Sequence, residues 1–370
     1  MAIYRQFNIV GPESPESSDV ISNVKDVVSS GMWADGASTL TSFFTSSVQS
    51  ASTAAHYLDV YASNPATDAN AKPQFSITYA HFFGSGSLGT KGTTGNRASA
   101  TMYRQLSQTL LGPNEDRFTF AGSGDHITPD YVYAISVSRQ QLREKMDPGN
   151  WELHLSGSTS ASLGDTPDST KFLKLIDDSN STTDPKVNQG GRVFNIVSGS
   201  IQSGQADIKT TAASQPGGAF GLFYPDLGIL VFNGPIMDAS ASLHHGSDGN
   251  VARLTTLDSN VEGGNVGKFY GAITGSFSPY FAARREEVIT SQHYFCRVPN
   301  KEFNFSSNPS FATASDGSFT QPTFYKNPKT FITQVGLYND GGELLAVAKL
   351  SKPLLKNYSR EAIIKVKLDF

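Results

Sequence analysis

The stretch AFGLFYPDLGILVFN, residues 219–233, decides the fold class of this chain. Two short apolar runs flank residues 224–228, YPDLG, where a proline and a glycine stand at positions that a tight turn favours. Apolar runs of this length on either side of turn residues are typical of a β-hairpin. The stretch therefore predicts two antiparallel strands joined by a short turn.

The C-terminal part is patterned in the same way. Residues 331–351, FITQVGLYNDGGELLAVAKLS, place Asn-Asp-Gly-Gly between two apolar runs, which is a strong hairpin signal. Residues 362–370, AIIKVKLDF, alternate between apolar and charged side chains, with Phe370 on the apolar side, as in a half-buried strand. We expect this last strand to dock in a sheet or against a neighbour, so that deletion of residues 361–370 leaves insoluble or unassembled protein. The side chains expected on one shared apolar surface are Leu337, Leu345, Val347, Ile364, Val366 and Leu368.

Composition extends this prediction to the rest of the chain. The 370 residues include 24 Phe, 14 Tyr, 34 Gly and 18 Pro, a mixture of strand-favouring aromatic residues and turn formers. Helices are expected at residues 98–111 and, more briefly, at 139–146, followed by a turn at 147–150, DPGN. Residues 19–30 carry Val at a helical spacing and stay undecided between helix and strand. The prediction is a mainly β, α+β protein with a few short helices, antiparallel sheets in sandwich-like sub-domains, and long loops.

The pattern also suggests a division of the chain. We expect an N-terminal arm at 1–35, an α+β domain at 36–157, a loop-rich β domain at 158–285 and a C-terminal β domain at 286–370. Polar loops are expected at 179–191 and 241–250. Loops of this length are unusual in a compact monomer, and contacts with neighbouring subunits would offset the entropy lost in ordering them.

Charge and cysteine content exclude several classes of function. Charged residues make up 17% of the chain and the formal net charge is −4, without a basic stripe, so nucleic acid is not an expected partner. No apolar run approaches the roughly 20 residues of a membrane helix, and the first residues lack the pattern of a signal peptide. Cys296 is the single cysteine, which excludes disulfides within one chain and cysteine-rich zinc sites. We expect folding in a reducing cytoplasm.

A glycine-rich stretch, QFSITYAHFFGSGSLGTKGTTGNR at residues 74–97, raises the question of nucleotide binding. Gly84, Gly86 and Gly89 spell G-x-G-x-x-G after an apolar run, and Lys91 lies close by. In a dinucleotide site the third glycine opens a helix, whereas further glycines here delay any helix until about Ala98. The lysine is also displaced by one position from that of a P-loop. The stretch is interpreted as a strand-to-helix connection, and Lys91→Ala is expected to change neither nucleotide binding nor folding.

Other candidate residues give no catalytic set. His244 and His245 with Asp238 and Asp248 could form a metal site, but adjacent histidines on a strand point to opposite faces. An exposed loop is the favoured interpretation there. No serine motif accompanies the possible bases, which are Asp125 with His126, and His154.

Two pairs of adjacent carboxylates, Glu286-Glu287 and Asp177-Asp178, are expected in solvated turns rather than as an acid/base couple. Cys296 is expected to be a small buried apolar residue rather than a nucleophile. The sequence predicts no catalytic residue, no cofactor and no metal.

Several segments together carry a resemblance. QVGLYNDGGELLAVAKLSKPLLKN is similar to hairpins of tail-fibre and baseplate-associated proteins of tailed bacteriophages. MYRQLSQTLLGPNEDRFTF, MDPGNWELHLSG, FGLFYPDLGILVFN, RVPNKEFNFSSNPSF and NPKTFITQVGLYNDGGELLAVAKLSKP resemble virion structural proteins of T-even-like contractile-tailed phages, notably those of marine bacteria and cyanobacteria. The resemblance covers most of residues 75–370 in pieces, each of them a packing or turn motif.

The resemblance implies an architectural role in a virion, in the tail or baseplate, for a protein made in the host cytoplasm. It implies symmetric copies of the chain assembled with other virion proteins, without nucleic acid or membrane as partner and without catalysis. Two alternatives stay open: a head or neck component, and a tail component that binds or depolymerises host-surface carbohydrate. A nucleotide-dependent enzyme is disfavoured because residues 74–97 depart from the nucleotide-binding motifs.

Overall fold

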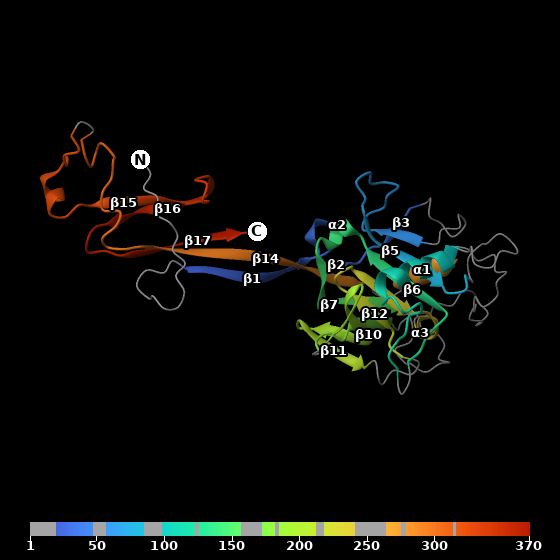
Figure 1. Cartoon of the computed structure of the whole chain (residues 1–370). Coiled ribbons are helices and arrows are strands. Elements are labelled where there is room, and N and C mark those ends of the chain that lie inside the picture. Colours follow the sequence, from blue (N-terminus) through green and yellow to red (C-terminus); the bar gives the residue numbers. More distant parts are fainter. Residues whose placement is uncertain are drawn as a thin grey trace. The chain divides into compact units, whose positions relative to one another are not determined.

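The computed structural model describes residues 20–46, 57–84, 98–122, 126–156, 172–181, 185–211, 218–240, 264–274, 279–313 and 316–370. The chain divides into two compact units (Figure 1). Residues 28–287 form the first, called here the core unit. The described residues 20–27 and those of 288–370 form the second, called the terminal unit. As expected from the sequence, the protein is mainly β with a few short helices.

The core unit is built on one large antiparallel sheet. Its strands follow in the spatial order β14 (Phe281–Val298, up to Glu287 in this unit), β7 (Lys145–Ser156), β8 (Phe172–Asp177), β10 (Gly191–Gln202), β12 (Gly221–Tyr224), β13 (Ile229–Asn233), β6 (Tyr131–Val137), β5 (Pro73–His81), β4 (Tyr57–Tyr61) and β3 (Phe44–Thr45). Three short strands join its flanks: β2 (Thr39–Leu40) on β14, and β9 (Lys186–Asn188) and β11 (Gln205–Thr210) on β10. The helices are η1 (Ala34–Gly36), α1 (Ala98–Leu110), α2 (Arg139–Leu142), α3 (Gly234–Ser240) and α4 (Gly264–Thr274).

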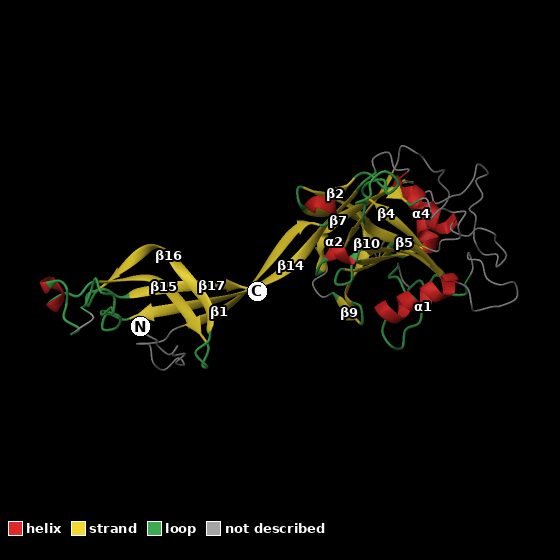
Figure 2. Ribbon diagram, turned by 90° about the horizontal axis from the view of Figure 1, so that it is seen from above, coloured by secondary structure: helices red, strands yellow, loops and turns green. Residues whose placement is uncertain are grey.

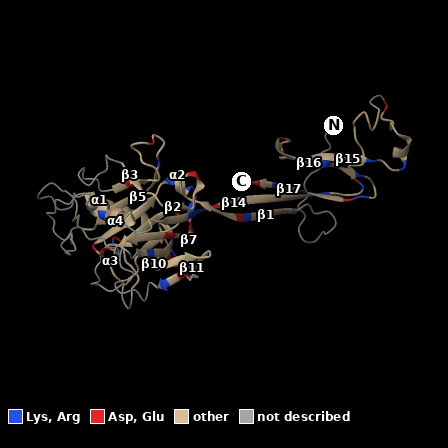
Figure 3. Cartoon of the chain, turned by 180° about the vertical axis from the view of Figure 1, so that it is seen from behind, with Lys and Arg blue, Asp and Glu red and all other residues tan. Residues whose placement is uncertain are grey.

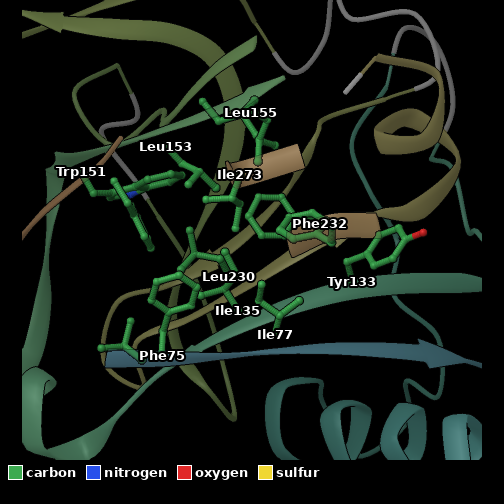
Figure 4. Packing of buried hydrophobic residues seen from close by; sticks show 14 of the residues in the cluster. Phe75, Ile77, Tyr133, Ile135, Trp151, Leu153, Leu155, Leu230, Phe232 and Ile273 are labelled. Atoms are coloured by element: carbon green, nitrogen blue, oxygen red, sulfur yellow. The ribbon is translucent and has the colours of Figure 1, made fainter. Parts of the chain in front are cut away.

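Alternation of side chains along the strands gives this sheet two buried faces. On β6, Tyr133 and Ile135 belong to one hydrophobic cluster, whereas Val132 belongs to another on the opposite face. The first cluster is the larger and encloses Phe269 and Ile273 of α4, while the second packs against α1 (Figure 2). The close view of the larger cluster shows side chains from several strands converging (Figure 4). The sheet is therefore covered by a helix on each face.

The hairpin at residues 219–233 is confirmed. Strands β12 and β13 pair antiparallel, from Gly221 opposite Phe232 to Tyr224 opposite Ile229. Gly228 adopts a positive φ of 64° in the turn, a conformation that glycine accepts without strain. The predicted helix at 98–111 is likewise confirmed as α1. Of residues 19–30, undecided from the sequence, the described residues 20–30 lie in β1 (Val20–Gly31).

Two expectations within the core unit differ from the structure. Residues 36–157 and 158–285, expected as separate domains, both contribute strands to the one sheet, and β7 and β8 pair across that boundary. The turn expected at 147–150 does not reverse the chain but forms a bulge inside β7, where Met146 and Trp151 face Arg285 and Ala283 on β14. Gly149 has φ of 78° there, and Asp177 accepts its amide hydrogen at 2.8 Å. The bulge is thus held by a neighbouring strand that local sequence does not indicate.

The terminal unit has a different construction. It contains the last part of β14 paired antiparallel with β17 (Ala362–Asp369), and a separate two-stranded sheet of β15 (Thr330–Tyr338) and β16 (Leu344–Lys356). The segment between β14 and β15 includes η3 (Pro322–Tyr325) and is organised around Phe311, which stacks on Phe324 at 4.9 Å. None of the three hydrophobic clusters of the described residues contains a side chain from this unit.

The predicted last strand is confirmed as β17, and its pairing covers residues 362–369. Ile364 and Val366 are buried as expected, but Phe370 is 72% exposed. The prediction of a shared buried apolar surface is wrong for the hairpin at 331–351, because Leu345 is 67% exposed and Val347 is 55% exposed. These two side chains lie on the two-stranded sheet of β15 and β16, where only Thr330 and Lys356 at the open end are buried.

Candidate functional site

A buried polar group in the core unit surrounds Asp238 on α3. The hydroxyl of Tyr131 donates to Oδ2 of Asp238 at 2.6 Å, and that of Tyr133 donates to Oδ1 at 3.1 Å. Both tyrosines come from β6, two residues apart and therefore on one face of the sheet. Lys268 on α4 lies within electrostatic range of the carboxylate and is also buried. These four residues are called the Asp238 cluster.

Local sequence explains how α3 reaches this position. The helix starts directly after β13 with Gly234 and Pro235, and proline is favoured in the first turn of a helix. A Cβ atom at Gly234 would stand 2.2 Å from Cδ2 of Tyr131, so a larger residue would push the tyrosine away. The glycine lets the ring of Tyr131 lie against the start of the helix while its hydroxyl reaches Asp238.

Burial determines the protonation states in the Asp238 cluster. Burial, and then the charge of Asp238, raises the pKa of Tyr133 well above its usual value. The pKa of Tyr79, whose ring lies 5.5 Å from that of Tyr133, is raised for the same reasons. Burial lowers the pKa of Lys268, and the negative charge of Asp238 opposes that shift. The Tyr133 phenol therefore remains protonated at neutral pH, and its bond to Asp238 fastens α3 to β6.

His81 extends the cluster along β5. Its ring stacks on Tyr131 at 6.0 Å with an interplanar angle of 3°. Nδ1 accepts the amide hydrogen of Phe83 at 3.0 Å, which places the proton of a neutral imidazole on Nε2. Burial lowers the pKa of His81 to about 4, so the ring is neutral at neutral pH.

A second polar group lies on β7 and β8. Nε2 of His154 and Oε1 of Glu152 are 2.5 Å apart, and Nζ of Lys174 lies 3.4 Å from the same oxygen. The amide of Ile201 donates to Oε2 of Glu152 at 2.7 Å, and the ring of Tyr280 stacks on His154. Burial raises the pKa of Glu152, but the bonds from His154 and Ile201 outweigh burial and lower it. His154, considered from sequence as a base, is thus engaged by a carboxylate that the sequence argument did not pair with it.

Both adjacent carboxylate pairs are structured, contrary to the expected solvated turns. Asp177 is fully buried at the end of β8 and binds the amides of Gly149 and Ser179. Burial raises the pKa of Asp177 against the lowering effect of these bonds. Asp178 binds the backbone and side-chain amides of Asn195 at 2.9 and 2.8 Å. These carboxylates join β8 to its neighbours, because backbone amides that face them need partners.

Glu286 and Glu287 lie on β14, not in a turn. Glu286 forms an ion pair with Lys145 at 2.7 Å. Glu287 forms ion pairs with Arg143 and Arg285, each at 3.1 Å. The two carboxylates therefore face separate cations and do not converge on one point.

Several candidate residues lie outside the described part of the chain. These are Gly86, Gly89, Lys91, Asp125, His244, His245 and Asp248. Two residues named with them are described: Gly84, three residues after the end of β5, has φ of 80°, and His126 is exposed. Cys296 is half-buried on β14 opposite Ile364, less buried than expected.

Two hollows are open to solvent. One of about 140 Å³ lies beside Asp178 and Asn195 in the core unit. The other, of about 250 Å³, lies in the terminal unit and is lined by Lys301, Phe303, Asn304, Phe305, Phe319, Pro328 and Tyr358. Neither hollow is lined by a member of the Asp238 cluster.

The described residues hold no group of three or more His, Cys, Asp or Glu side chains suited to a metal ion. Among the same residues, no helix has the length and apolar character needed to cross a membrane. Comparison with protein-family models, with curated proteins and with solved structures gives no match.

Most of the Asp238 cluster could not be predicted from the sequence. In the sequence Asp238 is a candidate only as a companion of His244 and His245, whereas its partners in the structure are 105 and 107 positions away. The one local signal was the alternation of Tyr131 and Tyr133 in a strand, which places both hydroxyls on one face.

Proposed function

We propose that this chain is a structural component of a contractile-tailed phage particle, a tail or baseplate subunit that assembles with other virion proteins and performs no catalysis. The resemblance of its turn and packing motifs to virion proteins suggests that the chain belongs to a phage particle. The exposed apolar side chains of the terminal unit suggest that it assembles with other proteins.

One observation carries the proposal. Residues 288–370 expose large apolar side chains while contributing none to the hydrophobic clusters of the described residues. The exposed side chains there are Phe305, Tyr325, Phe331, Tyr338, Leu344, Leu345, Val347, Tyr358, Ile363 and Phe370. Contiguous exposed apolar surface is typical of protein interfaces. Such a unit gains stability when a neighbouring subunit covers it, as the subunits of a particle do.

The test is the location of the protein in the phage. Mass spectrometry of purified particles should find the chain in stoichiometric amount, and gold-labelled antibodies should mark the tail end in electron micrographs. Label spread over the capsid would indicate a head or neck component instead. Absence from purified particles would refute the structural role.

A second candidate function is favoured by the hollow in the terminal unit. Phe305 and Tyr358, 50% and 57% exposed, lie at this hollow together with the amide side chain of Asn304. Aromatic faces beside polar groups are common in small-molecule sites. A tail component that binds host-surface carbohydrate would use such a hollow.

Calorimetric titration with host-surface polysaccharide distinguishes this candidate. If it is correct, Phe305→Ala and Tyr358→Ala abolish binding, whereas Tyr325→Ala, at an exposed aromatic residue outside the hollow, leaves binding unchanged. The absence of heat with the unaltered chain would exclude carbohydrate binding.

A further inference from the structure

We infer that the β15–β16 hairpin is a self-association surface, covered by the same hairpin of a second copy of this chain in antiparallel orientation. The inference deepens the proposed function by naming the partner and the surface. It rests on the proposed function only for the expectation that the chain assembles in copies.

The hairpin lacks the contacts that normally stabilise two strands. Among the described residues its sheet consists of β15 and β16 alone, and no other described strand pairs with either outer edge. An isolated two-stranded hairpin is at best marginally stable in water. Gly336 pairs with Val347 and Leu337 with Ala346, and the strands remain paired as far as Tyr338 and Leu344 beside the turn.

Apolar side chains are exposed along the length of this hairpin. Phe331 is 62% exposed near its open end, and Leu344, Leu345 and Val347 are 52%, 67% and 55% exposed toward the turn. Val335, in the middle of β15, is half-buried. An exposed, apolar, two-stranded sheet with free edges is a template for pairing with another chain.

The end of the hairpin away from its turn, where Thr330 pairs with Lys356, is held by hydrogen bonds to the rest of the terminal unit. These bonds limit the movement of the two strands. Lys356 is fully buried, and its Nζ donates to the carbonyls of Asn300 and Asn357 and to Oδ1 of Asn304, at 2.9–3.1 Å. Thr330 adds a bond from its hydroxyl to the carbonyl of Phe303 at 2.7 Å. Both strands are thus fastened where they leave the rest of the unit.

The charges at the two ends of the hairpin favour a second copy of the same hairpin, packed antiparallel, as its partner. Asp340 and Glu343 are exposed at the turn, whereas Lys349 near the middle of β16 and Lys352 nearer its open end are exposed on that strand. Figure 3 colours the acidic residues of the chain red and the basic residues blue. Two copies packed antiparallel bring the acidic turn of each beside the lysines of the other. Parallel packing would bring like charges together, which is unfavourable. The hairpin is therefore complementary to itself under a two-fold axis, the commonest symmetry of protein oligomers.

Sedimentation velocity of the purified full-length chain tests the surface. Self-association should weaken at least tenfold in the double variant Leu345→Glu, Val347→Glu. The matched control is Val187→Glu, which changes a side chain that is 73% exposed in the core unit and should leave association unaltered. A chain that is monomeric at all concentrations, or a double variant that associates as the unaltered chain does, would overturn the inference.

Charge reversal tests the orientation and does not depend on apolar substitutions that could unfold the hairpin. Asp340→Lys with Glu343→Lys should weaken association, as should Lys349→Glu with Lys352→Glu. All four changes in one chain should restore it, because each turn again meets the opposite charge. Failure of the fourfold variant to associate while it keeps the circular dichroism of the unaltered chain would refute antiparallel packing.

Cross-linking adds a positive readout. In a Cys296→Ser background, a short bismaleimide should join chains carrying Asp340→Cys to chains carrying Lys352→Cys when the two are mixed. Each variant alone should give no dimer band, because the two like positions lie about 30–40 Å apart along antiparallel hairpins. Cross-linking of either variant to itself instead of in the mixture would overturn the proposed orientation. Since these measurements use isolated protein, they fail or succeed independently of where the chain is located in a phage particle.

Discussion

Buried polar side chains show how single residues fix the packing of the core unit. Asp238 is 8% exposed and accepts hydrogen bonds from Tyr131 and Tyr133, which places a carboxylate between a helix and a strand. Such a group is costly to bury without partners and stabilising with them. The contribution of each tyrosine hydroxyl is therefore measurable by its removal.

Replacing Tyr133 by Phe should lower the free energy of unfolding of the core unit by about 1.5–3 kcal/mol, because one hydrogen bond to a charged, buried group is lost. Urea denaturation followed by tryptophan fluorescence measures this change, since Trp33 and Trp151 are the two tryptophans and both are buried in this unit. Tyr57→Phe, at a tyrosine 45% exposed, is the control and should change stability by less than about 0.5 kcal/mol. Equal effects of the two variants would contradict a stabilising role for Asp238.

His81 should make the core unit less stable in mild acid. Its pKa of about 4 in the folded state is lower than the usual 6.5, so the unfolded chain binds more protons between these values. The free energy of unfolding therefore falls as the pH decreases from about 7 to about 4. His81→Asn retains a hydrogen-bond acceptor but does not titrate, so its stability should fall less over this range.

The unaltered chain is the comparison for His81→Asn. Urea denaturation at several pH values measures the slopes. Identical slopes for His81→Asn and the unaltered chain would show that His81 does not contribute to acid sensitivity.

At the scale of elements, the bulge in β7 depends on a conformation that other residues rarely adopt. Gly149 has φ of 78°, and a Cβ atom there would stand 2.8 Å from Nδ2 of Asn180 and 3.0 Å from Oγ of Ser179. The amide of Gly149 is held by buried Asp177. Substitution at this position therefore combines backbone strain with a steric conflict.

Gly149→Ala should destabilise the core unit by more than the strain of a positive φ alone, which is about 1–2 kcal/mol. The matched control is Gly204→Ala, because Gly204 has φ of 77° with nothing near its Cβ position. The difference in unfolding free energy between the two variants, from urea denaturation, isolates the steric part. A Gly149→Ala variant no less stable than Gly204→Ala would show that Asn180 and Ser179 move away freely.

The elements that sequence predicted are those whose signal is local. The hairpins at 219–233 and 331–351 carry their turn residues between apolar runs, and α1 ends at Leu110, one residue short of the predicted end. The bulge at 147–150 was interpreted as a turn because Asp-Pro-Gly-Asn is a turn sequence, while its partner Asp177 lies on another strand. The Asp238 cluster escaped prediction for the same reason, since its members meet only in the folded chain. Exposure of Leu345 and Val347 was missed because periodicity indicates an apolar face but not what covers it.

At the scale of the whole molecule, the division into two units predicts that each responds separately to substitution. The terminal unit contributes nothing to the hydrophobic clusters of the described core unit, and its last strand pairs with residues 291–298 of β14. Removal of buried methyl groups from β17 should therefore act on the terminal unit alone.

Ile364→Ala with Val366→Ala should destabilise the terminal unit by several kcal/mol, because both side chains are buried. Limited proteolysis should cleave residues 288–370 faster, while the urea midpoint reported by Trp33 and Trp151 stays the same. Ile363→Ala, on the same strand but 68% exposed, should alter neither measurement. A shift of the tryptophan midpoint in the double variant would show that the two units unfold together. Deletion of residues 361–370 is expected to have a larger effect in the same unit, leaving insoluble or unassembled protein.

The two parts of the terminal unit leave the ribosome at different times, because the core unit lies between them in the sequence. The first described residues of the terminal unit, 20–27 of β1, belong to a strand that neighbours β14, and the 260 residues of Val28–Glu287 are synthesised between them and residue 288. At about 5–20 residues per second, the early strand waits roughly 13–50 s for its partner to emerge. During that delay the core unit has time to fold. The terminal unit is therefore completed only after the core unit, when residues 288–370 have been synthesised.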